Sequence, residues 1–432
     1  MQLTVENIGI IKKANVTIDG LTVIAGNNDT GKSTIGKILF SIVKSISRYK
    51  EDLEEDKEKN IKQLVDRIYF ILRRKINFNE NIAIKDMFYP VSFMDDISKN
   101  SIEAVNDRIE FINTEDMGKI IYDRLQDLKK IVEQDDNKNE TIKRAFKKIL
   151  YSEFADEITN KHIKKSELSY INIKEGQNEI LNIDMKNLND IHFELNDDLY
   201  FNDSTLIETP MILNFNESIE NSRSYFEIRD KSDRLSFLGM PNIAFHIKDI
   251  DSKLKESTYN DENLFQNNEL SQKISDIVNG EMKFISKEKE FIYIKKDGKR
   301  YKSINTASGI KAFGILQMLF NSGLIDERSI IIIDEPEVHL HPKWQLKYAE
   351  LIVLLVKNNI NILVTTHSPY MIEALELFSQ KENISSNFYI SEKYENNTVI
   401  TDVNGNLEEI YKTLSEPFST LEEISLKDTF KW

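Results

Sequence analysis

Hydrophobic residues near the start of the chain alternate and cluster as strands require. Residues 3–7 and 14–18 carry short β-favouring runs, and we expect a turn or bend at 9–14 between them. The run LTVIAG at 21–26 is apolar and ends in glycine, which predicts a buried strand. In residues 32–46 apolar positions recur at spacings of three and four, so an amphipathic helix is expected directly after a glycine-containing loop.

The pattern changes between about residues 46 and 165, where charged stretches favour helix and glycine and proline are scarce. We interpret this segment as a helical insertion. Two roles stay open for it: a packing arm with a solvated face, or a surface for DNA or a protein partner. The second role rests on local basic clusters at residues 73–75, 143–148 and 161–165, which are separated by acidic residues.

Strand-like runs return at residues 169–174, 179–185 and 204–213, and a mixed, helix-leaning segment follows from about 217 to 279. Residues 289–304 alternate on both sides of Asp297 and Gly298, which predicts a hairpin. The runs SIIIIDEP and NINILVTTHSP indicate buried parallel strands, with a helical pattern at 343–357 between them. We therefore expect an α/β fold with a mixed sheet and a parallel core, built from 1–45 and 166–432 and interrupted by the mainly helical insertion 46–165.

Composition narrows the class of protein. With 40% hydrophobic and 30% charged residues, the 432-residue chain has the makeup of a globular protein. No apolar run reaches the roughly 20 residues that a membrane span needs, and no signal peptide is evident, so a cytoplasmic location without a membrane partner is expected. The absence of cysteine excludes disulfides and Cys-ligated zinc. A net charge of −15 argues against indiscriminate coating of nucleic acid, but leaves a local basic groove open.

The loop after the first buried strand carries the first chemical motif. GNNDTGKST fits G-x-x-x-x-G-K-[ST] between a strand and a helix, which is the context that a phosphate-binding loop requires. Its glycines let backbone amides turn toward phosphates, and the helix N-terminus adds the positive end of its dipole. We expect Lys32 to reach the β- and γ-phosphates of ATP and Ser33 to bind Mg²⁺. The predicted nucleotide-binding residues of this loop are Gly26, Asn27, Asn28, Asp29, Thr30, Gly31, Lys32, Ser33 and Thr34.

Two later strands end in candidate catalytic residues. IIIIDEPE places Asp334 at the carboxyl end of a buried strand, where it would hold the magnesium shell, and Glu335 stands where a carboxylate can act as general base. His367 ends the next strand, where an imidazole can hydrogen-bond the γ-phosphate; a purely structural role is the alternative. His339 and His341 are spaced like a metal pair, but the lack of a third ligand nearby in the sequence disfavours a metal site.

A Ser-Gly pair opens another predicted helix. Ser308 and Gly309 stand in ASGIK, directly before the helix-like run AFGILQMLF. Backbone amides and a hydroxyl at a helix N-terminus can bind an anion together. Such pairs are also common helix caps, so the pair alone does not establish a site.

In their order along the chain, the phosphate loop, the Ser-Gly pair, DEPE followed by HLHP, and THSP resemble the ABC-type ATPase heads of the RecF, SMC and OLD group. The resemblance implies a head-to-tail ATP sandwich dimer. In it, the phosphate loop, Asp334, Glu335 and His367 of one chain face Ser308 and Gly309 of the other, with ATP and Mg²⁺ between them. It covers about the first 45 and the last 160 residues well, and the middle poorly.

The sequence departs from the pattern of that group in two places. Ile310 stands where the fuller signature has a second glycine, which fits the OLD-like branch better than transporters. No glutamine is assigned to the Q-loop, for which Gln177 is a poor candidate. Around the motifs, the runs TASGIKAFGILQML, DEPEVHLHPKWQLKYAE and THSPYMIEAL look like those of the stand-alone anti-phage defence ATPases of the Septu type.

That resemblance implies an ATP-hydrolysing sensor or regulator that controls a separately encoded HNH nuclease. Only residues 368–432 follow His367, too few for a TOPRIM domain, and the six histidines are scattered, so we expect no nuclease activity in this chain. Two alternatives stay open: a stand-alone DNA-repair ATPase of the SMC or RecF kind, and a nucleotide-dependent scaffold with little turnover. A transporter subunit is disfavoured because both membrane spans and the usual signature are missing.

Overall fold

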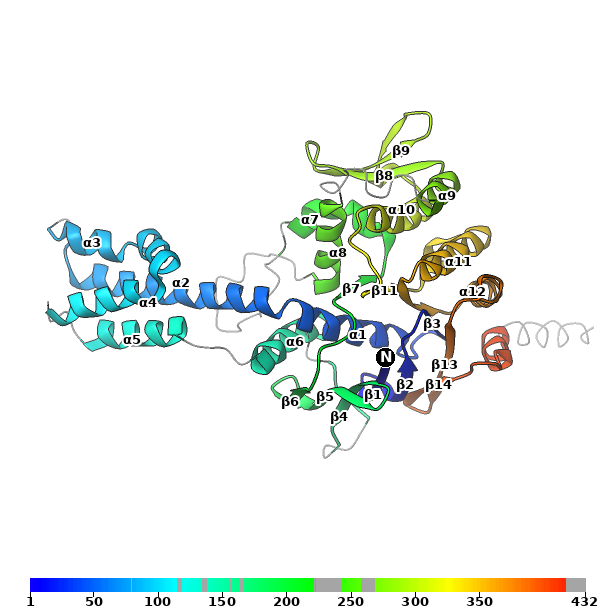
Figure 1. The fold of residues 1–432 in the computed structure, drawn as a ribbon, viewed down its shortest axis with the longest axis horizontal. Helices are drawn as coiled ribbons and strands as arrows, with labels where there is room; N and C mark the ends of the chain where they lie inside the picture. Colours follow the sequence, from blue (N-terminus) through cyan, green and yellow to red (C-terminus); the bar gives the residue numbers. More distant parts are fainter. Residues whose placement is uncertain are drawn as a thin grey trace, which may run out of the picture. The chain divides into compact units, whose positions relative to one another are not determined.

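The computed structural model describes residues 1–78, 80–114, 119–133, 138–155, 157–162, 167–220, 222, 243–257 and 269–416. The chain divides into two compact units (Figure 1). One unit, called the head here, comprises Met1–Ser47 and Phe146–Trp432; the other, called the helical unit, comprises Arg48–Ala145. The helical unit thus ends before residue 165, the expected end of the insertion.

A large mixed sheet forms the centre of the head. Within the described ranges it has 11 strands in the order β6-β5-β4-β1-β2-β14-β13-β3-β12-β11-β7. Their bounds are β1 (Gln2–Ile8), β2 (Ile11–Thr17), β3 (Leu21–Gly26), β4 (Ser169–Glu175), β5 (Asn178–Asn187), β6 (Asp190–Leu195), β7 (Asp203–Ile207), β11 (Ser329–Asp334), β12 (Asn361–Thr366), β13 (Ser386–Tyr394) and β14 (Asn397–Asp402).

The sheet has a parallel half and a mainly antiparallel half. Strands β13, β3, β12, β11 and β7 run parallel to one another. Strands β2, β1, β4, β5 and β6 pair antiparallel, and β14 joins the two halves by pairing antiparallel with β13 and parallel with β2. This topology confirms the predicted α/β fold with a mixed sheet and a parallel core around the phosphate loop.

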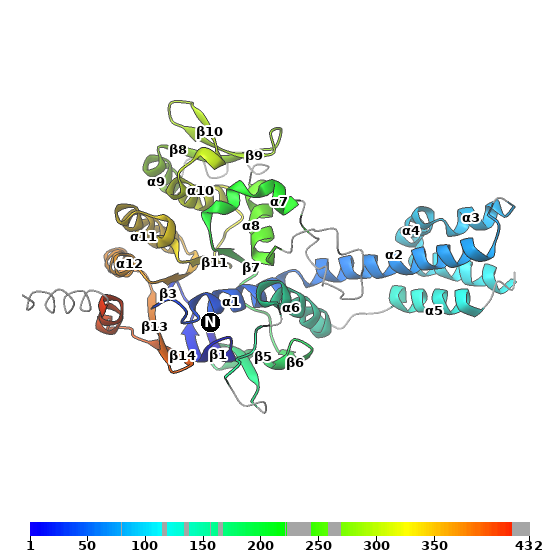
Figure 2. The same cartoon turned by 180° about the vertical axis from the view of Figure 1, so that it is seen from behind.

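Helices cover both faces of the parallel half (Figure 2). A Cβ added at Gly36 of α1 (Lys32–Ser47) would lie 2.8 Å from Cγ2 of Ile332, so α1 packs closely on the face that Ile332 presents. On the opposite face, Ile331 and Ile333 share one hydrophobic cluster with α10 (Ser308–Asn321), α11 (Pro342–Lys357) and α12 (Pro369–Glu382). Strands buried on both faces explain why the sequence runs SIIIID and NILVTT are almost wholly apolar.

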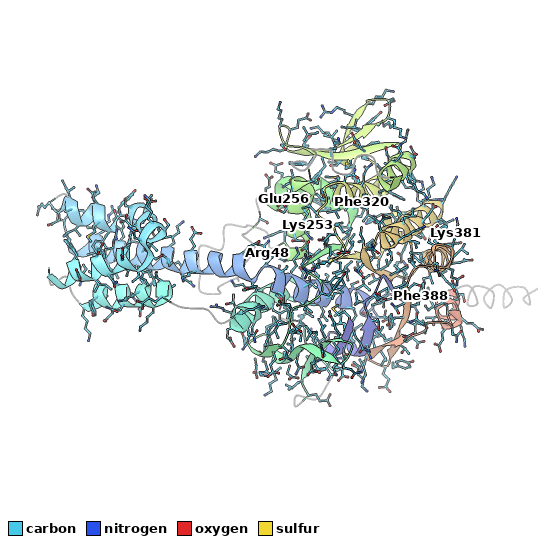
Figure 3. All side chains as sticks on the ribbon, in the orientation of Figure 1. Arg48, Lys253, Glu256, Phe320, Lys381 and Phe388 are labelled. Carbon is cyan, nitrogen blue, oxygen red and sulfur yellow. The ribbon has the colours of Figure 1, made fainter. Side chains whose placement is uncertain are left out.

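The remaining head elements pack around this core. They are the part of α6 (Lys138–Phe154) from Phe146 onward, η1 (Pro210–Asn214), α7 (Asn216–Glu220), α8 (Phe245–Glu256), α9 (Glu269–Val278), η3 (Ser303–Asn305), η4 (Pro336–His339) and a small antiparallel sheet of β8 (Gly280–Ile285), β9 (Glu290–Lys295) and β10 (Arg300–Lys302). Among the side chains labelled in Figure 3, Phe388 of β13 is buried in the hydrophobic cluster and Phe320 of α10 packs against it.

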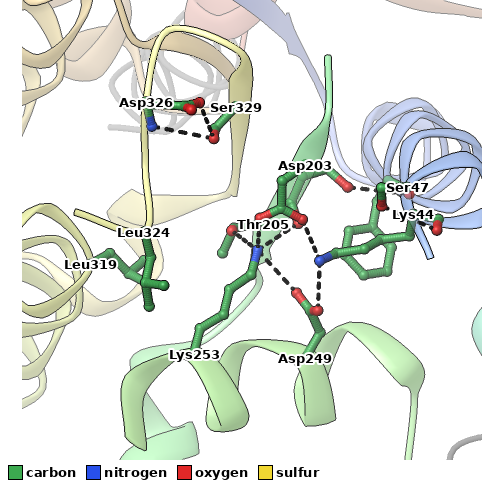
Figure 4. A network of polar contacts seen from close by, with 12 residues as sticks. Lys44, Ser47, Asp203, Thr205, Asp249, Lys253, Leu319, Leu324, Asp326 and Ser329 are labelled. Carbon is green, nitrogen blue, oxygen red and sulfur yellow. Dashed lines mark hydrogen bonds and ion pairs between the residues drawn. The ribbon is translucent and has the colours of Figure 1, made fainter. Parts of the chain in front are cut away.

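Helix α8 is joined to the parallel half by a buried cluster of charges, which we call the Lys44 cluster: Lys44, Asp203, Asp249 and Lys253 (Figure 4). Lys44 Nζ of α1 lies 2.5 Å from Asp203 Oδ1 of β7 and 2.7 Å from Asp249 Oδ1 of α8. Lys253 Nζ lies 2.5 Å from Asp203 Oδ2 and 3.4 Å from Asp249 Oδ2. Two positive and two negative charges therefore balance where α1, β7 and α8 meet.

The helical unit has a core of its own. It consists of α2 (Tyr49–Lys75), α3 (Ile82–Phe88), α4 (Pro90–Thr114), α5 (Lys119–Glu133) and the residues of α6 up to Ala145. Helices α2, α4 and α5 pack on one another around a cluster that includes Val65, Phe93 and Leu125. Helix α4 is interrupted at Asn100 and Ser101, which have non-helical backbone angles.

Most predicted elements are present, but some were missed or misplaced. Strands β6, β8, β13 and β14 were not predicted, although in β6 and β8 Ile191 and Phe193, and likewise Met282 and Phe284, alternate with polar residues. The turn expected at 9–14 is shorter, because β2 begins at Ile11, and the strand expected at 204–213 ends at Ile207 with β7. Helix α6 belongs to both units, because from Phe146 onward it packs on the sheet, where the Phe146 and Phe193 ring centroids are 5.8 Å apart. Of the helices in the described ranges, none combines the length and the apolar character that crossing a membrane requires.

Candidate nucleotide-binding site

The phosphate loop connects β3 to α1 and is braced by β13. Gly26 has a φ of 154°, and a Cβ there would lie 2.5 Å from the Ser391 carbonyl oxygen, so only glycine fits this close approach. Ser391 Oγ donates to the carbonyl oxygen of Thr30 at 2.7 Å, and Lys393 Nζ lies 2.6 Å from Asp29 Oδ2. Residues more than 350 positions away in the sequence thus fix the shape of the loop.

Lys32 is buried at the start of α1 and points back toward the loop. Its side chain is 3% exposed, and Nζ donates to the Asn27 carbonyl oxygen at 2.8 Å. The same Nζ lies 3.5 Å from Oε1 of Glu335. The hydroxyl of Thr30 also donates to Asn27, at 2.8 Å. The ammonium group is therefore held by one carbonyl oxygen and one carboxylate, at the place where the motif predicts phosphate.

Asp334 ends β11, next to the carboxyl end of β12. Its carboxylate accepts a hydrogen bond from Thr365 Oγ1 of β12. Burial raises the pKa of Asp334, and the hydroxyls of Thr365 and of Ser33, at the start of α1, oppose that rise. The structure thus brings together the two residues, Ser33 and Asp334, that the sequence predicts for Mg²⁺.

Glu335 follows with a strained backbone. Its φ of 45° and ψ of 55° lie in the left-handed region, which is costly for a residue with a Cβ. Its backbone amide donates to the carbonyl oxygen of Thr365 at 3.1 Å, and that contact helps to hold this conformation. The pKa of Glu335 is lowered, first by the neighbouring imidazole of His367 and then by the charge of Lys32. Glu335 is therefore ionised at neutral pH.

His367 lies between two glutamates. Its Nδ1 is 3.5 Å from Glu335 Oε1 and 3.3 Å from Glu337 Oε1, and these carboxylates raise the pKa of His367, with Glu335 as the main cause. Glu337 is buried and accepts hydrogen bonds from the His367 backbone amide at 2.6 Å and from Thr366 Oγ1 at 2.7 Å. Glu337 was not among the predicted site residues. Glu337 holds the loop that carries His367, and it reaches that loop because the turn of η4 contains it.

A fourth carboxylate, Glu208, stands beside Asp334. Ile207, the last residue of β7, pairs with Ile333 of β11. The residues that follow this pair, Glu208 and Asp334, therefore lie at the carboxyl ends of two neighbouring parallel strands. Oε1 of Glu208 lies 3.4 Å from Nζ of Lys37, one helical turn after Ser33. The sequence analysis missed Glu208. Its signal is an acid directly after the buried strand residues Leu206 and Ile207, a shorter form of the pattern that identifies Asp334.

The predicted Ser-Gly pair begins α10 and packs against the segment that follows Glu337. Ser308 Oγ donates to the carbonyl oxygen of His339 at 3.2 Å. A Cβ on Gly309 would lie 3.0 Å from the Trp344 ring, so glycine allows α10 to approach α11 closely. Among the described residues, the recorded contacts of the Ser-Gly pair are therefore with η4 and α11 of its own chain and not with the phosphate loop.

Other predicted residues have structural partners. His339 Nε2 lies 3.2 Å from Thr209 Oγ1, and His341 Nδ1 accepts from the Lys343 amide at 3.3 Å as the N-cap of α11. Gln177 lies in the turn between β4 and β5, in the antiparallel half of the sheet.

The basic clusters are only partly described. Residues 73–75 form the last turn of α2, and residues 143–148 lie within α6. In the third cluster, residues 163–165 lie outside the described residues.

Comparison with known proteins agrees with the motifs. A family model described as "AAA ATPase domain" matches residues 1–372. The Septu protein PtuA of Bacillus thuringiensis is 45% identical over 49 residues, a segment that spans 11% of this chain and 12% of that protein.

Solved structures similar to the chain include SMC heads. The SMC head domain from Thermotoga maritima is 12% identical with a TM-score of 0.40, and the match covers 93% of this chain and 98% of that one. An SmcHead bound to the C-winged helix domain of ScpA is 12% identical with a TM-score of 0.44, covering 95% and 98%.

Proposed function

Because the chain belongs to the family of AAA ATPase domains, we propose that it binds ATP with Mg²⁺ and transfers the γ-phosphoryl group to water. One observation carries the proposal. Lys32, Asp334, Glu335 and His367 gather where β3, β11 and β12 end, and these three neighbouring strands run parallel. Ligands of open α/β sheets bind at such carboxyl ends.

The residues present fit both ATP and Mg²⁺. A buried ammonium group and the N-terminus of the 16-residue helix α1 suit phosphate. Ser33 and Asp334 supply a hydroxyl and a carboxylate, which are oxygen ligands that Mg²⁺ accepts together with water and phosphate oxygens. When bound, Mg²⁺ neutralises part of the phosphate charge.

The ion pair between Lys32 and Glu335 suggests how binding prepares the reaction. A phosphate oxygen competes for Lys32 Nζ, which has Glu335 as its carboxylate partner at 3.5 Å. Glu335 is then free to accept the proton of the attacking water as the bond between the γ-phosphorus and the bridging oxygen breaks. His367, held by Glu337, donates to the γ-phosphate or to Glu335.

The site is completed by a second copy of the chain. Ser308 and Gly309 of one copy close over the nucleotide held by the other, in the head-to-tail dimer that the resemblance implies. Exposed apolar residues on η4 and α11, the two elements that the Ser-Gly pair contacts, support an interface there. Val338 of η4 is 57% exposed and Leu346 of α11 is 45% exposed. The test is size-exclusion chromatography of Glu335→Gln, which we expect to elute as a dimer with Mg-ATP and as a smaller species without it.

The match to PtuA, which covers a small part of both chains, supports the proposed biological role. The chain acts in the cytoplasm of a prokaryote as a sensor or regulator of anti-phage defence and controls a separately encoded HNH-type nuclease. Purification of the tagged chain together with the product of its neighbouring gene tests this role. Recovery of a nuclease supports it, and recovery of the chain alone in every nucleotide state contradicts it.

One specific feature favours a second candidate, a stand-alone ATPase that binds DNA. Arg73, Arg74 and Lys75 form a basic last turn of α2. If they contact phosphates, DNA binding by the isolated protein weakens steeply with salt, and replacing all three by alanine lowers the slope of that dependence. The nuclease-regulator role requires no such binding.

A further inference from the structure

His246, at the start of α8, is buried between two carboxylates. Its Nδ1 lies 2.7 Å from Oε2 of Glu153 on α6, and its Nε2 lies 3.0 Å from Oε2 of Glu208. The His246 backbone amide also donates to Oε1 of Glu153, at 3.0 Å. The side chain of His246 is 1% exposed and that of Glu153 is 0% exposed. The two carboxylates contact both ring nitrogens and so fix the orientation of the imidazole.

Both ring nitrogens of His246 carry protons in this arrangement. An ionised carboxylate only accepts hydrogen bonds, so each nitrogen that faces one must donate. Burial works against the charged ring, but Glu153 and Glu208 together raise the pKa of His246 to about 9. In turn, the hydrogen bond from His246 is the main cause that lowers the pKa of Glu208 to about 2. Glu208 is therefore a fixed negative charge.

The other side of Glu208 faces the candidate nucleotide site. Its second oxygen lies 3.4 Å from Lys37, on the same helix as Ser33, and its charge contributes to the raised pKa of Asp334, which is mainly due to burial. Residues in register on adjacent parallel strands point to the same side of the sheet, and neighbouring strands lie about 4.8 Å apart. Glu208 and Asp334 follow such a pair, Ile207 and Ile333.

We infer that His246 is a positioning residue of the nucleotide site, which fixes the Glu208 carboxylate beside Asp334 and so adds a negative charge on the side where the divalent cation of the nucleotide binds. The inference rests on the proposed ATP site. His246 itself touches neither the nucleotide nor the cation; it acts through Glu208.

Helix α8 is a firm support for this role. One turn after His246, Asp249 enters the Lys44 cluster, and Lys253 of the same cluster donates to the Ser204 carbonyl oxygen and to Thr205 Oγ1 of β7. The helix is thus attached to β7, the strand directly before Glu208, by contacts that do not involve His246. Replacing His246 is expected to release Glu208 without detaching α8.

The test measures binding of a fluorescent ATP analogue to the full chain, once in EDTA and once over a series of Mg²⁺ concentrations. We expect His246→Asn to bind the analogue in EDTA within about twofold of the unchanged protein. For His246→Asn, the Mg²⁺ concentration at which half of the Mg-dependent gain in analogue affinity is reached should rise about tenfold or more. Losses of this size in metal affinity are typical when a group that orients a metal-binding carboxylate is removed. Glu208→Gln should give the same shift.

The matched control is His192→Asn. His192 Nε2 lies 3.0 Å from Glu194 Oε1, but both side chains are exposed, so this pair has the same chemistry away from the site. We expect no change in the Mg²⁺ series. If His246→Asn does not fold, as judged by its melting curve, Glu208→Gln decides alone, because Glu208 is 37% exposed and its replacement by glutamine, which has nearly the same shape, is expected to fold.

Two results would overturn the inference: an unchanged Mg²⁺ series in Glu208→Gln, or an equal loss of affinity with and without Mg²⁺, which indicates a merely structural role. Failure of the proposed function is distinguishable, because it would appear in the unchanged protein. A protein that binds the analogue with the predicted Mg²⁺ shift but does not hydrolyse ATP retains the inference and contradicts the ATPase. A protein that binds no analogue contradicts both.

Discussion

The Lys44 cluster allows a quantitative prediction about stability. Lys44 is 4% exposed and Asp249 is 5% exposed, and the charges of Asp249 and Asp203 raise the pKa of Lys44 although burial opposes this. In Lys44→Met, Lys253 is left with two carboxylates and the cluster gains a net charge of −1. Breaking a buried ion pair by removing one partner costs about 3–5 kcal/mol, because the other charge is left uncompensated. We expect the head to lose about that much stability.

A double variant separates charge balance from packing. Lys44→Met together with Asp249→Asn restores neutrality around the pair of Asp203 and Lys253. Although it carries two changes, it should be more stable than Lys44→Met alone, with a coupling free energy of about 1–3 kcal/mol. The surface control is Lys161→Met, because Lys161 lies 2.8 Å from Glu157 in a pair whose side chains are 67% and 72% exposed. Removing that exposed pair should leave the free energy of unfolding nearly unchanged, because water and salt screen the two charges.

The assay follows urea unfolding by the fluorescence of Trp344, whose ring lies edge-on to Phe313 in the head at a centroid distance of 5.4 Å. The chain has two tryptophans, so Trp432→Phe in every variant makes Trp344 the single reporter. A single probe in the head avoids mixing its transition with that of the helical unit. If Lys44→Met costs no more than Lys161→Met, the cluster is screened by water and the reasoning is refuted.

Three further outcomes follow from the structure. Since the pKa of His246 is raised to about 9 from an ordinary value of 6.5, its charge stabilises the folded state by about 3 kcal/mol below pH 6.5, and this contribution is lost as the pH rises toward 9. The gap in unfolding free energy between the unchanged protein and His246→Asn should therefore narrow between pH 6.5 and 9, and a constant gap argues against the ion triad. Gly36→Val should destabilise the head by about 1–3 kcal/mol in the same urea assay, because a Cβ there meets Ile332 at 2.8 Å; a neutral result would mean that α1 shifts freely. Lys32→Ala should abolish ATP turnover and weaken binding of the fluorescent analogue, and turnover at the rate of the unchanged protein would contradict the role of Lys32.

Local sequence was sufficient to predict the residues that end buried strands. Asp334 ends an apolar run and His367 directly follows one, each typical of an interior strand, and parallel strands bring their carboxyl ends together. The phosphate loop was predicted for the same reason, since a strand, a glycine loop and a helix are consecutive in the chain. These inferences need no knowledge of which distant strands pair.

Residues whose role depends on distant pairing were missed. Glu208 lies beside Asp334 because β7 pairs with β11, which lies more than 100 residues later in the chain. His246 is joined to Glu153, 93 positions away, and nothing in its own helix distinguishes it from a surface histidine. The end of the helical insertion was misplaced because α6 is one uninterrupted helix whose two ends belong to different units, a division that packing determines and helical periodicity does not reveal.

The central claim is that this chain hydrolyses ATP with Glu335 as the base. The most direct measurement compares phosphate release and bound nucleotide for the unchanged protein and for Glu335→Gln, both with Mg-ATP. We predict that Glu335→Gln releases phosphate at least about 100-fold more slowly, the contribution expected of a general base, while retaining bound ATP. Phosphate release by Glu335→Gln at the rate of the unchanged protein would contradict the account.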